Sequence, residues 1–131
     1  MEVLNVIAAA LGAFGFGAVW YMSMSNPWIK AAGVPVDAMG KPQGNGSPLP
    51  FVVGLVAMVI VAGMMRHVFA EAGVVTLGAG IVSGLGVGAF LITPWVAMNY
   101  AFAMRPAMLS VIDGVNAVVG CAIIGAVLTL F

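Results

Sequence analysis

Few side chains in this sequence are equipped for chemistry, and the clearest of them is the carboxylate of Asp113. It lies about two turns inside the last apolar stretch of the chain. A carboxylate near the middle of a bilayer costs on the order of 3 kcal/mol, so such a group faces protein and has a partner. One interpretation makes Asp113 a proton or cation site. The other makes it a structural acceptor that holds helices together, and we favour this second interpretation.

The expected partners of Asp113 are polar and aromatic residues that the topology brings to the same level of the membrane. One of them, Asn116, follows Asp113 by three residues and lies on a neighbouring face of the same helix. We expect Asp113 to point into the protein and to accept a hydrogen bond from at least one of these groups. The predicted structural polar site consists of Asp113, Asn116, Trp20, Tyr21, Asn99 and Arg105.

The other reactive residue types are too sparse for a catalytic or metal centre. His67 is the single histidine, and Cys121 is the single cysteine and lies in an apolar run. Metal motifs need several such ligands, and nucleophilic sites need a base beside the nucleophile. The sequence therefore predicts no catalytic residue, no metal ligand and no bound cofactor, and we expect a protein that is not an enzyme.

The composition places these residues in a membrane. Of the 131 residues, 63% are hydrophobic and 6% are charged, whereas soluble domains have about 45–50% and about 25%. A soluble chain this short leaves too much surface exposed to hide so many apolar side chains. The formal net charge is zero, so there is no basic stripe for phosphates and we expect no nucleic-acid partner.

Four apolar stretches are each long enough to cross a bilayer, which takes about 20 residues. They cover about residues 3–24, 49–70, 74–98 and 108–131, and residues 25–48 form a polar loop rich in Gly and Pro. Each stretch must be helical, because within lipid only a helix satisfies its own backbone hydrogen bonds over that length. The predicted fold is an all-α, polytopic bundle of four transmembrane helices, with two hairpins joined by the long polar loop. All of residues 1–131 belong to this single transmembrane domain.

The basic residues predict how the chain is oriented. Lys30, Lys41 and Arg105 lie in the first and third connections, and Arg66 lies on the opposite side. Since basic residues favour cytoplasmic loops, we expect both termini outside. Glu2 and the lack of a basic residue before the first apolar run argue against a cleaved signal peptide. We therefore expect a retained first helix and a multi-pass protein of the bacterial inner (cell) membrane.

Small residues recur every four positions along the third and fourth stretches. In lipid no hydrophobic force draws helices together, so close backbone approach along small-residue grooves takes its place. We predict that these two helices pack against each other through this glycine zipper, although the same faces also suit the docking of another chain. The residues are Gly80, Gly84 and Gly88 on one helix and Ala117, Cys121 and Gly125 on the other.

Two segments carry a resemblance to a known family. Gly17–Tyr21, followed by Asn26–Trp28, resembles the first-helix signature of the membrane family called domain of unknown function 1761. Phe102–Pro106, followed by Ile112–Gly114 and Gly125–Ala126, resembles its last-helix pattern. The resemblance covers most of the chain. It implies a small four-helix integral membrane protein and implies no established activity.

Two classes of function remain open. The first is a non-catalytic accessory or structural subunit that packs in the bilayer against a larger membrane complex. The second is a small-solute or ion transporter, or a channel, that acts as a homo-oligomer. We favour the first because Asp113 is the one clear ionisable group in mid-membrane, whereas a transport path needs several polar groups through the membrane depth. The expected partners are the lipid bilayer and other membrane-protein subunits or a second copy.

Overall fold

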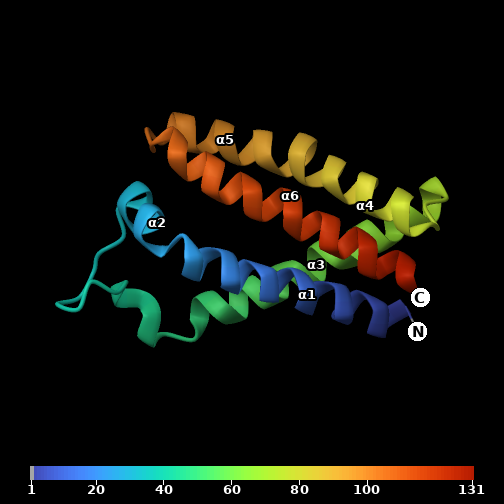
Figure 1. Ribbon diagram of the computed structural model, residues 1–131, viewed down its shortest axis with the longest axis horizontal. Coiled ribbons are helices and arrows are strands. Elements are labelled where there is room, and N and C mark those ends of the chain that lie inside the picture. Colours follow the sequence, from blue (N-terminus) through green and yellow to red (C-terminus); the bar gives the residue numbers. More distant parts are fainter. Residues whose placement is uncertain (1) are drawn as a thin grey trace.

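The computed structural model describes residues 2–131, and over this range the chain is helical without a β-strand (Figure 1). Four helices in it are long and apolar enough to cross a membrane: α1 (Glu2–Ser23), α3 (Leu49–Ala72), the composite helix Leu77–Phe102, and α6 (Ala107–Leu130). The two termini lie at the same end of the molecule, as an even number of crossings requires (Figure 1). This confirms the prediction of an all-α, multi-pass membrane protein.

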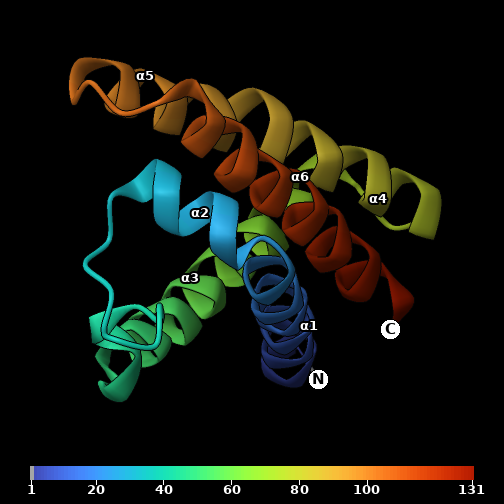
Figure 2. The ribbon, with the colours of Figure 1, turned by 60° about the vertical axis from the view of Figure 1, so that its left-hand side comes forward.

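The four spanning helices form an open row. Helices α1 and α6 make the central pair, and the composite helix packs on the outer side of α6. Helix α3 packs mainly on α1 and contacts α6 at the end that carries the termini. Figure 2 shows α3 turning away from α6 at the end of the molecule that carries α2. The two outer helices therefore do not close on each other. The long connection joins α1 to α3, and a tight turn at residues 73–76 links α3 to the composite helix.

Two prolines decide where the regular helices break. Pro27 has no N–H to donate to the carbonyl of Ser23, which explains why α1 ends at Ser23. Pro94 likewise leaves the carbonyl of Phe90 without its regular partner. The composite helix responds with a π-helical segment, η2 (Val87–Ile92), between α4 (Leu77–Gly86) and α5 (Thr93–Phe102). Such segments add one residue to a helical turn.

The predicted polar loop contains helix, which corrects the expectation for residues 25–48. The short helix α2 (Ser25–Ala32) continues from α1 after a turn at Met24, and a 3-10 turn, η1 (Gln43–Gly46), lies near the start of α3. Because Pro27 stands in the first turn of α2, its missing N–H costs nothing there. Gly33 ends α2 with a φ of 67°, a left-handed conformation that favours glycine.

The third spanning helix begins later and ends later than the expected residues 74–98. Gly73 ends α3 in the left-handed conformation with a φ of 69°. The Thr76 side chain then accepts a hydrogen bond from the backbone N–H of Ala79 over 3.2 Å, so Thr76 caps α4 and the helix starts at Leu77. At its other end the helix continues to Phe102, through residues expected to lie in a connection.

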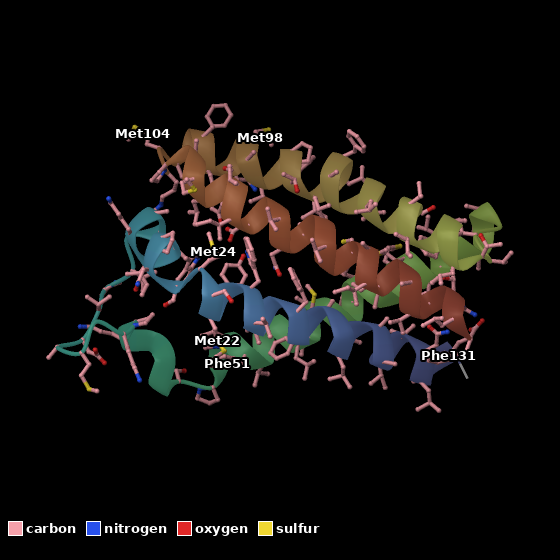
Figure 3. All side chains as sticks on the ribbon, viewed as in Figure 1. Met22, Met24, Phe51, Met98, Met104 and Phe131 are labelled. Atoms are coloured by element: carbon pink, nitrogen blue, oxygen red, sulfur yellow. The ribbon has the colours of Figure 1, made fainter. Side chains whose placement is uncertain are left out.

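The apolar core lies between α1, α3 and α6, toward the end with the termini. Small side chains of α1 let both neighbours approach closely, and α3 and α6 also contact each other here. The core is built from Ala9, Ala10 and Ala13 of α1, Ala62, Met65 and Phe69 of α3, and Cys121, Ile124 and Leu128 of α6. In Figure 3 the labelled side chains Met98 and Met104 mark the opposite end from Phe131.

Outside this core, α4 packs on α6, and the glycines of α4–η2 lie against the backbone of α6. A Cβ added to Gly84 would lie 2.8 Å from the carbonyl carbon of Cys121 and would overlap the carbonyl oxygen. A Cβ on Gly88 would lie 2.8 Å from the carbonyl carbon of Ala117, and one on Gly80 would overlap the carbonyl oxygen of Gly125. The structure thus places all six of the helix-packing residues named above in one contact between α4–η2 and α6.

Candidate functional site

Three spanning helices meet at the carboxylate of Asp113. Asp113 is half-buried and lies six residues after the start of α6, a rise of about 9 Å along the helix. Its Oδ1 accepts a short hydrogen bond from the hydroxyl of Tyr21 on α1. Its Oδ2 accepts another from the hydroxyl of Tyr100 on α5. Asp113 therefore ties α1 and α5 to the helix that lies between them.

Small residues beside the carboxylate allow the three helices to come this close. A Cβ on Gly17 of α1 would lie 3.3 Å from Oδ1 of Asn116, one turn along α6 from Asp113. On the other side of α6, a Cβ on Gly114 would lie 2.9 Å from Cγ2 of Thr93. The two tyrosines each stand two residues before the end of their helix. These helix ends lie at the same side of the molecule, beside the start of α6 (Figure 1).

Aromatic side chains surround the tyrosine contact on α1. The indole Nε1 of Trp20 donates a hydrogen bond of 2.9 Å to the backbone carbonyl of Ile112, the residue before Asp113. The ring of Trp28, on α2, meets the ring of Tyr21 edge-on, with 6.0 Å between the ring centroids. The cluster thus also links α2 to the spanning helices. We name the set Asp113, Tyr21, Tyr100, Trp20 and Asn116 the Asp113 cluster.

Two residues of the predicted polar site lie elsewhere. Asn99 is exposed, and no hydrogen bond of its side chain is found among the described residues. Arg105 reaches away from Asp113 and donates a hydrogen bond of 3.1 Å to the carbonyl of Ala32, the last residue of α2. A cation at the C-terminal end of a helix satisfies a free carbonyl and the helix dipole together. Arg105 therefore fastens α2 to the connection before α6.

The sequence interpretation missed Tyr100, and the π-helical segment explains why. Asn99 follows Gly88 by eleven residues, which is three turns of a regular α-helix, so a regular helix would turn both toward α6. The π-segment adds one residue after Gly88, so the next residue that faces α6 is Thr93. Tyr100 follows Thr93 by seven residues, about two helical turns, and therefore also faces α6. Trp95 accordingly points outward and is 67% exposed. Pro94 was the signal from which the shift could have been anticipated.

The carboxyl group of Asp113 has no cationic partner in the described part of the chain. The one ion pair between residues 2 and 131 joins Glu2 to Arg66 over 3.5 Å, and these residues lie at the opposite end of the molecule. The same residues contain no group of three or more His, Cys, Asp or Glu side chains that could hold a metal ion. Among the described residues, the side-chain groups that donate to the Asp113 carboxylate are the hydroxyls of Tyr21 and Tyr100.

A comparison with known protein families covers nearly the whole chain. The family model described as "Protein of unknown function (DUF1761)" matches residues 4–129. The chain belongs to the DUF1761 family. The match covers all five residues of the Asp113 cluster and confirms the resemblance seen in the first and last helices. No curated protein and no solved structure matches this DUF1761 chain. The family description assigns no activity, so the functional argument rests on the geometry.

Proposed function

We propose that this protein is a non-catalytic accessory subunit that packs in the bilayer against a larger membrane complex. The observation that carries the proposal is the open row of helices. Its two outer members, α3 and the composite helix, each pack against other helices on one side only. For a bacterial protein we propose the inner (cell) membrane, because these spans are helices and outer-membrane spans are barrels.

The first turns of α3 are exposed around much of their surface. Phe51, Val52 and Val53 are consecutive in the helix, so their side chains point in three directions about 100° apart, and all three are more than half exposed. Farther along α3, Ala62 and Phe69 are buried against α1 and α6. Helices associate in lipid through shape-complementary packing. A partner helix beside Phe51–Val53 would supply that packing for the half of α3 that lacks it.

The Asp113 cluster supports a structural role within this subunit. Both carboxylate oxygens already accept hydrogen bonds, and each donor comes from a different spanning helix. A group held in this way orients α1, α5 and α6 relative to one another. On this proposal the chain performs no chemistry of its own and presents a correctly shaped surface to its partner.

Cross-linking from α3 tests the partner. A photoreactive residue in place of Val52 should capture a second membrane protein in the native membrane. The same residue in place of Val111 of α6, which is also more than half exposed, should capture far less of it. Mild extraction followed by native mass determination should show that protein at a fixed ratio. The proposal would be wrong if the protein were a monomer without a co-purifying membrane protein and the two positions gave equal cross-linking.

One observation favours a second candidate, a small-solute or ion transporter or channel that works as a homo-oligomer. Asp113 is an ionisable group in the membrane without a cationic side chain beside it, and such residues often mark ion pathways. The test is flux in proteoliposomes. If the chain transports, Asp113→Asn should abolish proton or solute flux, whereas Arg105→Gln should retain it. Absence of flux from the unaltered protein excludes this candidate.

A further inference from the structure

A groove of about 330 Å³ runs between α1 and α3 at the end of the molecule that holds the termini. Most of its wall is apolar, and two charged side chains of opposite sign stand at its mouth. The groove is lined by Val3, Val6 and Ile7 of α1, Val59 of α3, and the charged residues Glu2 and Arg66. Neither charged residue belongs to the Asp113 cluster, so this is a separate feature of the molecule.

The groove runs along the axes of α1 and α3. Arg66 and Val59 are seven residues apart on α3, a rise of about 10 Å, so the groove extends two helical turns inward from the charged mouth. Val3, Val6 and Ile7 are spaced as neighbours on one face of α1 and form the facing wall. An apolar channel that leads from a charged mouth into the hydrocarbon region matches the upper part of a lipid acyl chain and its headgroup.

The guanidinium of Arg66 has donor capacity to spare. One nitrogen, Nη1, donates to the carbonyl of Leu128 over 3.3 Å, and Nη2 donates to Oε1 of Glu2 over 3.5 Å. Its Nε is buried and has no hydrogen-bond partner. The donors open to a ligand are therefore those of Nη1 and Nη2, whose present contacts are both long. Guanidinium has five N–H donors in a planar fork that fits two phosphate oxygens at once. Glu2 is a weak competitor for this fork, since its side chain is 77% exposed and its contact is long.

We propose that this groove binds a phospholipid whose headgroup carries both a phosphate and a primary ammonium, as phosphatidylethanolamine does. The phosphate binds Arg66, the ammonium binds Glu2, and one acyl chain lies along Val6 and Val59. The two charges at the mouth complement the two charges of this headgroup. A phosphatidylglycerol headgroup leaves Glu2 without a cation, and the quaternary ammonium of phosphatidylcholine has no N–H to donate to the carboxylate.

Native mass spectrometry of the purified, delipidated full chain tests this proposal. Phosphatidylethanolamine, phosphatidylglycerol and phosphatidylcholine with the same acyl chains are added back separately. We expect the first to be retained at least about five-fold more than either of the others, the factor expected for one added charge contact at a membrane surface. Arg66→Gln should lower its retention by a similar factor. Arg105→Gln, at the opposite end of the chain, should leave retention unchanged.

Two further variants keep the test decisive if Arg66→Gln does not fold. Glu2→Gln alters an exposed side chain and should remove the preference for phosphatidylethanolamine over phosphatidylglycerol. Val59→Trp should fill the groove and abolish retention of the lipid while the melting temperature without lipid stays the same. Equal retention of the three lipids by the unaltered chain would overturn the proposal. So would a preference for phosphatidylethanolamine that survives both Glu2→Gln and Val59→Trp.

Discussion

Replacing Gly84 by leucine should destroy the packing of α4 on α6 and cost at least about 3 kcal/mol of unfolding free energy. A Cβ at this position already overlaps the carbonyl oxygen of Cys121 and comes within 3.0 Å of the Cα of Ala122. These atoms belong to the α6 backbone, which cannot rotate away as a side chain can. Overpacking a tight contact usually costs about 1–3 kcal/mol, and here the whole contact between the two helices must open.

The measurement is unfolding of the purified protein in mixed micelles, followed by helicity as the denaturing detergent is raised. Gly86→Leu is the matched control, because Gly86 lies in the same helix and nothing is within 4 Å of a Cβ placed on it. This control should unfold at nearly the same detergent fraction as the unaltered chain. If Gly84→Leu and Gly86→Leu proved equally stable, the packing of α4 on α6 described above would be wrong.

Removing the carboxylate with Asp113→Ala should cost about 2–3 kcal/mol of unfolding free energy. The substitution removes two hydrogen bonds between helices and leaves the hydroxyls of Tyr21 and Tyr100 without their acceptor. Hydrogen bonds between membrane helices contribute about 0.6 kcal/mol on average and up to about 1.7 kcal/mol. In each of these two bonds a tyrosine hydroxyl donates to a carboxylate oxygen, so we place their contributions at the upper end of this range.

A mutant cycle separates this effect from a general loss of packing. Tyr21→Phe and Tyr100→Phe should each destabilise the protein by about 1 kcal/mol, and neither should have a further effect once Asp113 is alanine. Asn99→Ala serves as the control, since Asn99 is exposed and a surface change of this kind stays within about 0.5 kcal/mol. Additive effects of the tyrosine and Asp113 substitutions would contradict the hydrogen bonding proposed here.

The location in a membrane and the helical fold follow from the sequence by itself. A composition this apolar leaves lipid as the solvent, and lipid leaves helices as the way to satisfy the backbone. The four spans could be found because each is a continuous apolar run, a property of the local sequence. The family could be recognised for the same reason, since its motifs are short and contiguous. The glycines of α4 could be assigned to a packing face because four-residue spacing marks one side of a regular helix.

The Asp113 cluster could be predicted only in part from the sequence, because its members come from three separate helices. The position of Asp113 required a partner, and Tyr21 was among the candidates because it lies at the same membrane level. The choice of Tyr100 over Asn99 depended on the π-segment between Gly88 and Thr93. The extra residue of that segment turns α5 about its axis, so that each position of α5 takes the direction that the preceding residue would have in a regular helix. The segment itself depends on how the helix accommodates Pro94 while it is packed on α6.

The order of the helices was decided by tertiary structure alone. Apart from the small-residue faces of the third and fourth spans, every span is apolar around most of its surface, so the sequence does not say which side of the other helices meets a neighbour. The small residues of α1 admit both α3 and α6, which puts α1 inside the row and leaves α3 at its edge. The same arrangement creates the groove between Val6 and Val59 and brings Glu2 to Arg66. These contacts join residues far apart in the chain, and packing in three dimensions is what selects them.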